Sequence, residues 1–153
     1  MPIDIQNLYR NNFFNRRQLR KLTRDTLAFL IHWFDLPQHV TIGILYVDNP
    51  QMCEYNKKHM GKNIPTDVIS FPFWDMNAAQ SPEPYAGDMI ISVEQASQQA
   101  GQEKHSLEDE LKLLLVHGFL HLMGYEDETP SKKRHMLGET REILKGLGLK
   151  KII

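Results

Sequence analysis

The chain has 153 residues, of which 41% are hydrophobic and 24% charged, and its 18 Lys and Arg nearly balance its 19 Asp and Glu. This composition excludes an intrinsically disordered chain and predicts one globular domain over residues 1–153. A net charge of −1 excludes general attraction to a polyanion, so any nucleic-acid binding needs a local basic surface. The single cysteine, Cys53, cannot form an internal disulfide, which fits a reducing compartment.

The N-terminal residues carry neither the basic nor the apolar segment of a signal peptide. The most apolar stretches, residues 27–34 and 113–123, each contain histidine and are shorter than the roughly 20 residues of a membrane-spanning helix. We therefore expect a soluble, cytoplasmic protein that has no membrane partner.

The first part of the chain alternates between strand and helix signals. A short strand is expected over residues 3–8, and apolar residues at helical spacing predict a helix over 15–35. β-Branched residues predict a strand over 39–47, and a short helix follows over 50–60. Basic residues crowd the first half of the longer helix. We interpret them as its solvated face, with a phosphate-contacting patch as the alternative: Arg16, Arg17, Arg20, Lys21 and Arg24.

The second part of the chain holds the remaining strands and most of the helices. Strands are predicted over residues 68–73 and 87–93, and Pro72 favours an edge or a bulge for the first because proline donates no ladder hydrogen bond. A loop is expected over 74–86. Three helices are predicted over 93–101, over 106–123 and from 130 onward. Strands early and helices late favour an α+β domain with a mixed sheet.

Two histidines stand four residues apart in the most apolar predicted helix. His117 and His121 differ by about 40° around the helix axis, so both imidazoles lie on one face, one turn apart. Gly124 permits a left-handed turn, and Asp127 follows where the reversing chain can return to the same ion. Burying two imidazoles is costly unless their polar atoms are satisfied, and a metal ion satisfies them. Two histidines and a carboxylate are typical of a catalytic zinc site because a fourth position stays open.

The residue after His117 distinguishes this pattern from that of zinc peptidases. Those enzymes carry a glutamate there as general base, whereas this chain has Gly118. The pattern therefore predicts a metal site that lacks a peptidase's base, which argues against peptide hydrolysis.

The same segment carries a family resemblance. Residues 117–127 read H-G-F-L-H-L-M-G-Y-E-D and resemble the H-G-x-L-H-L-x-G-Y-D-H signature of the YbeY family of bacterial metal-dependent endoribonucleases. Residues 65–73, P-T-D-V-I-S-F-P-F, are similar to the family's P-T-N/D-V-L-S-F-P-F. Residues 3–7 resemble its usual opening and residues 87–91 its G-D-I strand. These blocks lie in family order and span nearly the whole chain.

The resemblance implies both a fold and a role. The fold is a single α+β domain with a mixed, mostly four-stranded sheet packed by helices and one zinc ion at the end of a central helix. The role is single-strand-specific RNA cleavage in ribosomal RNA maturation, chiefly at the 3′ end of small-subunit rRNA, and in ribosome quality control. The implied partners are single-stranded or ribosomal RNA and the ribosome or its proteins.

Two positions depart from the family pattern. Asp127 stands where the family has its third histidine ligand; a carboxylate binds zinc, but its charge makes the ion a weaker Lewis acid. Met60 stands where the family has an arginine thought to serve RNA cleavage, and methionine neither binds phosphate nor stabilises developing charge. The sequence leaves open whether cleavage is weaker, relies on neighbouring lysines or is lost.

The resulting hypothesis assigns catalysis to the metal ligands and to a basic segment. His117, as a zinc ligand, belongs to the catalytic centre that acts on a scissile phosphodiester. Lys62 is expected to act in catalysis by holding the phosphate. The RNA contacts are expected from Lys57, Lys58 and Lys62.

Two further residues, Ser70 and Thr66, are expected to orient substrate or water, with Ser70 counted among the catalytic residues. Glu126 and Glu128 are close in sequence to the metal ligands, but neither is assigned as general base.

Two alternatives to the endoribonuclease remain. The first is a weakly active or non-catalytic ribosome-maturation factor that has a structural metal and binds RNA or a ribosomal protein; Met60 and Asp127 favour it. The second is a hydrolase of another bond, since metal hydrolases share scaffolds.

Overall fold

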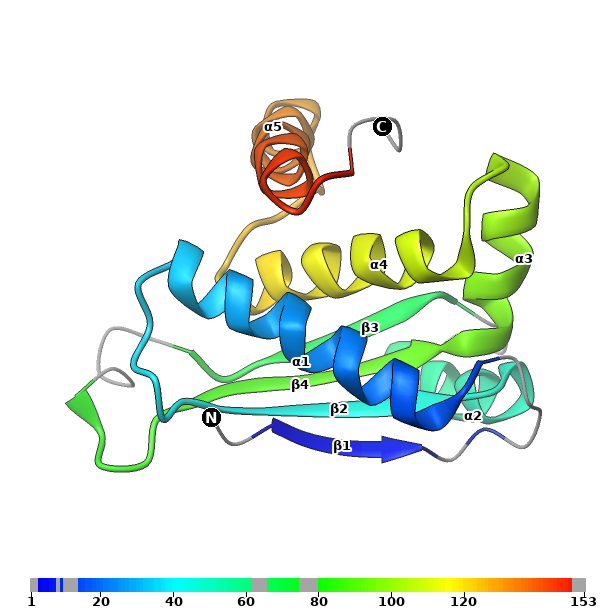
Figure 1. Cartoon of the computed structure of the whole chain (residues 1–153), viewed down its shortest axis with the longest axis horizontal. Coiled ribbons are helices and arrows are strands. Elements are labelled where there is room, and N and C mark those ends of the chain that lie inside the picture. Colours follow the sequence, from blue (N-terminus) through cyan, green and yellow to red (C-terminus); the bar gives the residue numbers. More distant parts are fainter. Residues whose placement is uncertain (1–2, 8, 10–13, 62–65, 75–79, 150–153) are drawn as a thin grey trace.

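A computed structural model of the chain describes residues 3–7, 9, 14–61, 66–74 and 80–149 (Figure 1). The described residues form an α+β fold with five helices and a four-stranded sheet, as expected. In chain order the elements are β1 (Ile3–Asn7), α1 (Arg16–Trp33), β2 (Thr41–Val47), α2 (Asn49–Met60), β3 (Val68–Pro72), β4 (Tyr85–Ser92), α3 (Val93–Glu103), α4 (Leu107–Leu122) and α5 (Pro130–Gly146).

The sheet is mixed and has the strand order β1-β2-β4-β3. β1 and β4 both pair in parallel with β2, whereas β3 runs antiparallel to β4. The prediction from Pro72 is confirmed, because β3 is an edge strand that ends at this proline. Ser70 of β3 is in register with Met89 of β4, which places it on the face of the sheet that carries α4.

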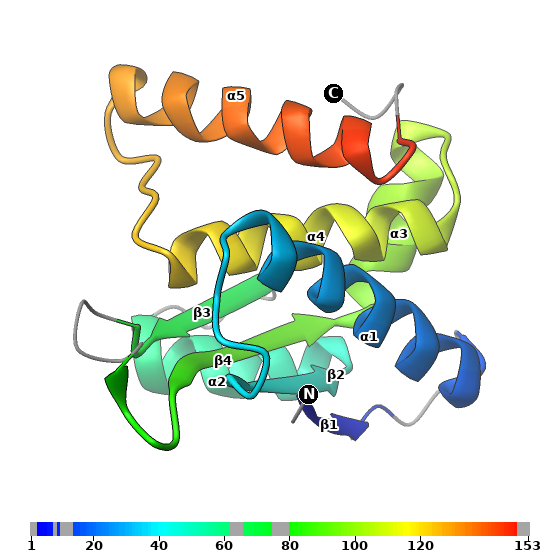
Figure 2. The ribbon, with the colours of Figure 1, turned by 60° about the vertical axis from the view of Figure 1, so that its left-hand side comes forward.

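Helices cover the two faces of the sheet unequally. α1 and α4 lie side by side over one face, α2 lies against the other, and α5 lies outside α4 (Figures 1 and 2). The larger hydrophobic cluster fills the α1–α4 face, and a small one of Val47, Met52, Ile69 and Ile90 lies under α2. α4 is the most enclosed helix, with seven buried apolar side chains: Leu111, Leu114, Leu115, Val116, Phe119, Leu120 and Leu122. Each contributes roughly 1.5–3 kcal/mol, so its histidines stand on a firmly packed support.

Polar side chains cap the N-termini of three helices. Asp48 and Gln51 form a capping box at α2, Ser106 accepts from the Asp109 amide at α4, and Thr129 accepts from the Lys132 amide at α5. Part of the predicted 74–86 loop, from 75 to 79, lies outside the described residues, as does Leu8 of the predicted first strand.

Several predicted boundaries, those of α1 and β4 among them, were wrong by a few residues. α1 ends at Trp33, because the following residues turn and Asp35 takes a φ of 52°. β4 begins at Tyr85, two residues earlier than predicted, because Tyr85 pairs with Thr41 across an irregularity in the β2–β4 ladder.

No helix among the described residues has the length and apolar content needed to cross a bilayer.

Candidate metal centre

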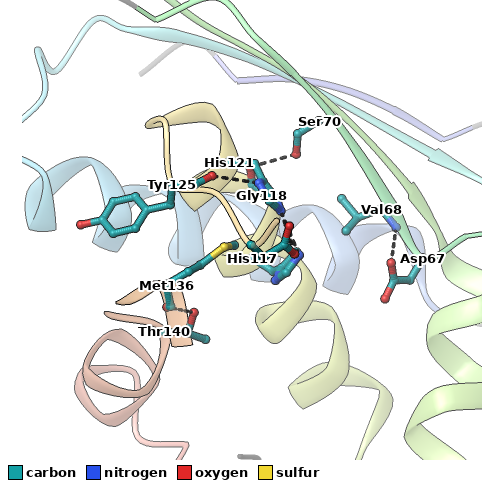
Figure 3. Close-up of polar contacts among 10 residues, drawn as sticks. Asp67, Val68, Ser70, His117, Gly118, His121, Tyr125, Met136 and Thr140 are labelled. Carbon is teal, nitrogen blue, oxygen red and sulfur yellow. Dashed lines mark hydrogen bonds and ion pairs between the residues drawn. The ribbon is translucent and has the colours of Figure 1, made fainter. Parts of the chain in front are cut away.

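The last two turns of α4 bring the two histidines together as the spacing predicts. The Nε2 atoms of His117 and His121 lie 3.2 Å apart (Figure 3). Both side chains are half-buried.

A backbone hydrogen bond sets the tautomer of His121. Its Nδ1–H donates to the carbonyl oxygen of Tyr125 over 3.0 Å, which leaves Nε2 as the atom with the free lone pair. The pKa of His117 is lowered, chiefly by burial and then by the neighbouring His121, so this ring is neutral near pH 7. A neutral ring with a free lone pair is the form in which histidine binds a metal ion.

The turn after α4 returns the third predicted ligand to the histidines. Gly124 has a φ of 94°, which favours glycine, and its amide donates to the carbonyl of His121. The chain reverses there, and the Asp127 Oδ2 atom comes within 3.8 Å of His121 Nε2. One ligand atom from each of the three residues lies within 4.8 Å of the others.

This donor set fits a zinc ion. In a tetrahedral site with bonds of roughly 2.0–2.1 Å, neighbouring ligand atoms lie about 3.3–3.4 Å apart, close to the 3.2 Å between the two Nε2 atoms. The Asp127 side chain is 45% exposed, so its carboxylate can rotate and shorten the 3.8 Å distance to His121 Nε2. Two imidazoles and a carboxylate are ligands that zinc prefers, and three protein ligands leave a position for water or substrate.

Gly118 has a steric reason to be glycine. A Cβ atom there would lie 2.5 Å from the Met89 sulfur and 3.1 Å from Val68 Cγ2, so this side of α4 lies directly on the sheet. The position at which zinc peptidases carry their base therefore has no room for a side chain.

Ser70 contacts the same point of the helix. Its hydroxyl donates to the carbonyl of Gly118 over 2.9 Å and so joins β3 to α4 beside the first histidine (Figure 3). The hydroxyl oxygen can still accept a hydrogen bond. Ser70 thus lies near the centre, as expected, while its part in catalysis stays a prediction.

A groove of about 630 Å³ opens beside the metal ligands. β3 and the turn after α4 form its sides, and the predicted orienting residues Thr66 and Ser70 line it together with His121 and Asp127. Trp74 and Tyr125 give it aromatic surface. A groove of this volume has room for more than the reacting group alone.

The predicted lysines are only partly located. Lys57 and Lys58 are exposed in the last turn of α2, and neither is among the residues that line the groove, although Asn56 is. Lys62 lies outside the described residues. Their RNA contacts stay predictions.

The two glutamates near the ligands differ in their surroundings. Glu126 forms an ion pair with Lys132 of α5, and Glu128 is exposed. Asp67 and Glu110 were not predicted as part of the site. The Asp67 carboxylate lies close enough to His117 and to Glu110 to raise the pKa of each. Only the packing of α4 brings them there, although Asp67 immediately precedes the predicted strand.

Comparisons with known proteins agree with this geometry. A family model described as Endoribonuclease YbeY matches residues 4–148. An Endoribonuclease YbeY of Bartonella henselae is 36% identical over 137 residues, which cover 89% of this chain and 87% of that protein. Another Endoribonuclease YbeY, of Geobacillus thermodenitrificans, is 39% identical over 138 residues, which cover 86% of this chain and 85% of that protein. The solution structure of a Thermotoga maritima protein superposes with a TM-score of 0.58 at 20% identity, over 96% of this chain and 93% of that one, and supports the fold alone.

Proposed function

The chain belongs to the YbeY family of endoribonucleases, and from this premise we propose that it is a zinc-dependent endoribonuclease that cleaves single-stranded RNA during ribosomal RNA maturation. The observation that carries the proposal is the group of three ligands, with the His117 and His121 Nε2 atoms 3.2 Å apart and Asp127 beside them at the edge of an open groove. We place its action in the cytoplasm, at the 3′ end of small-subunit rRNA and in ribosome quality control.

One group of residues binds the metal ion, and a second group binds and orients the RNA. His117, His121 and Asp127 hold zinc, which supplies Lewis acidity toward a phosphate oxygen. Thr66 and Ser70 orient substrate or water from the β3 side of the groove, where the Ser70 oxygen accepts a hydrogen bond while its own O–H donates to the Gly118 carbonyl.

The basic segment that begins in the last turn of α2 supplies the positive charge. Lys57 and Lys58 at the end of α2, together with Lys62, hold the phosphates on either side of the scissile bond. Charge-assisted contacts of this kind give affinity without sequence preference and weaken as salt rises.

The groove suits an unpaired strand. Trp74 lines the groove and offers an aromatic ring on which an exposed base stacks, and a base-paired duplex presents no such base. The lack of room for a base beside His117 argues against a peptidase. RNA is therefore the substrate that best fits both the ligands and the groove.

Metal content and cleavage test the proposal together. The purified protein should contain one zinc ion per chain and cleave a single-stranded RNA oligonucleotide but not its duplex, and a chelator should abolish cleavage until zinc is restored. His117→Ala and His121→Ala should lose both zinc and cleavage. His39→Ala, which removes an exposed histidine outside the site, should keep both. Full zinc retention in both ligand variants would refute the site.

The second candidate function is a ribosome-maturation factor whose metal is structural. The observation that favours it is the anionic ligand Asp127, which weakens the Lewis acid, and the ion pair that engages Glu126. In that case zinc loss should lower the unfolding temperature while the zinc-loaded protein binds RNA without cutting it.

A further inference from the structure

A second cavity begins at the metal ligands on the side away from the groove. It has a volume of about 270 Å³ and lies between α4 and α5, which pass over each other in opposite directions (Figure 2). We call it the α4–α5 cavity. It is lined by Asp67, Glu110, Leu113, Leu114, His117, Asp127, Lys133, Met136, Leu137 and Thr140.

The exposure of the lining residues decreases from the mouth of the cavity to its floor. Asp127 and Lys133 are exposed at the mouth, and His117 and Asp67 are half-buried in the walls. Glu110 and Thr140 are each only 4% exposed and lie at the floor. The cavity thus extends from the exposed Asp127 to the buried Glu110 and Thr140.

The walls between mouth and floor are apolar. Leu113 and Leu114 from α4 face Met136 and Leu137 from α5. Flat apolar surfaces on two opposing helices suit a planar aromatic ring, and the volume lies just below the usual range for small-molecule sites, roughly 300–1,000 Å³. The opening is therefore suited to one nucleobase rather than to a larger group.

Apart from His117 and from Lys133 at the mouth, the polar side chains of the cavity offer oxygen atoms as acceptors. The Asp67 carboxylate accepts from the Val68 amide over 2.7 Å and from Gln99 Nε2 over 3.3 Å, and each oxygen keeps a further lone pair. The Thr140 hydroxyl donates to the Met136 carbonyl, which leaves its oxygen to accept (Figure 3). Glu110 is already paired with His105. A ligand that fits must therefore present N–H donors.

On the basis of the proposed RNA-cleaving function, we propose that the α4–α5 cavity takes the base of a nucleotide next to the scissile phosphate and prefers guanine. Guanine offers two adjacent donors, N1–H and the N2 amino group, which match the two oxygens of Asp67. Uracil offers one N–H between two carbonyl groups, which a carboxylate repels. Lys133 at the mouth of the cavity binds the phosphate of the same nucleotide.

The cavity also explains why the strand must be unpaired. A base reaches the space between two helices only after it leaves its stack and its pairing partner, which costs least in single-stranded RNA. The Watson–Crick edge that Asp67 reads is the edge that a duplex conceals.

Direct binding tests this inference without metal or cleavage. Guanosine, adenosine, cytidine and uridine are titrated into the protein in a chelator, and the methyl resonances of Leu113 and Leu137 are followed by NMR. We expect guanosine to shift both leucines and to bind roughly tenfold more tightly than uridine. Asp67→Asn keeps the hydrogen bond to the Val68 amide, so it should fold, and it should lose that preference. The control is Asp109→Asn, which makes the same chemical change at a position on α4 that does not line the cavity; this variant should keep the preference for guanosine.

Two results would overturn the base-binding role. One is the absence of leucine shifts with any nucleoside, and the other is an unchanged preference in Asp67→Asn. Cleavage of oligonucleotides that vary at one position beside the cut separates this inference from the proposed function. Cleavage with no nucleoside binding refutes the cavity and leaves the nuclease standing, whereas guanosine binding without cleavage refutes the nuclease and keeps the base site.

Discussion

The ring of His121 is oriented by the backbone of Tyr125. Its Nδ1–H donates to the Tyr125 carbonyl, and this contact directs Nε2 toward the Nε2 atom of His117, 3.2 Å away. Tyr125 reaches this position because the chain turns at Gly124, and the same turn returns Asp127 to the histidines. One backbone reversal therefore orients one ligand and supplies another.

Substitution of Gly124 should weaken both the fold and the metal site. With φ at 94°, a Cβ atom is strained, and Gly124→Ala should lower the free energy of unfolding by about 1–2 kcal/mol. Zinc affinity should fall roughly tenfold, because the Tyr125 carbonyl and Asp127 shift together. Urea unfolding and zinc competition with a chromophoric chelator measure the two effects. Gly124→Asn should be milder in both, since asparagine tolerates left-handed backbone better; equal effects of Ala and Asn would contradict the argument.

The grouping of the candidate metal ligands was predictable because these residues are close together in the sequence. His117, His121, Gly124 and Asp127 lie within eleven residues, and helix geometry alone places the first two on one face. The edge position of β3 followed from Pro72 for a similarly local reason.

The α4–α5 cavity could not be predicted in this way. Its floor joins Glu110 to Thr140, thirty residues apart, and its wall includes Asp67 from before β3. These residues meet only through the packing of α5 on α4 and of α4 on the sheet, and no sequence period encodes that packing. The pairing of Tyr85 with Thr41, which lengthens β4, is a long-range contact of the same kind.

Gly118 should tolerate no side chain, although alanine favours helices. In Gly118→Ala the new methyl group meets the Met89 sulfur, Val68 and Ser70, and overpacking of this kind costs roughly 1–3 kcal/mol. Gly138→Ala is the matched control, because Gly138 also lies inside a helix and has nothing within 4 Å of the new Cβ. It should stabilise the protein by up to about 1 kcal/mol. Thermal unfolding of both variants measures the difference, and a Gly118→Ala protein as stable as Gly138→Ala would disprove the close approach.

The buried carboxyl of Glu110 should make stability depend on pH. Burial raises the pKa of Glu110, although the hydrogen bond from His105 opposes this. A carboxyl with a raised pKa in the folded state binds its proton more tightly there. Its contribution to stability is therefore present below its ordinary pKa and declines as pH rises through the raised value.

The Glu110→Gln variant should not show this loss of stability with rising pH. The amide still pairs with His105 but carries no charge to bury, so the stability of the variant relative to the parent should increase by the order of 1 kcal/mol between pH 4 and pH 7.5. Urea unfolding at the two pH values measures this. Glu108→Gln, at an exposed position on the same helix, should show little change between them. A relative stability of Glu110→Gln that falls as pH rises would reverse the assigned sign.

Replacing the anionic ligand should increase cleavage if the centre is catalytic. In Asp127→His three neutral ligands leave the full charge of zinc available, so the ion becomes a stronger Lewis acid and cleavage of single-stranded RNA should rise, by roughly tenfold. Met60→Arg adds a group that can hold a phosphate, and the double variant should exceed either single one. Zinc content is measured in each, so that a change in occupancy is not mistaken for a change in rate. Variants that keep zinc and bind RNA but show no gain in cleavage would favour the maturation factor with a structural metal, because a structural ion does not act on the phosphate.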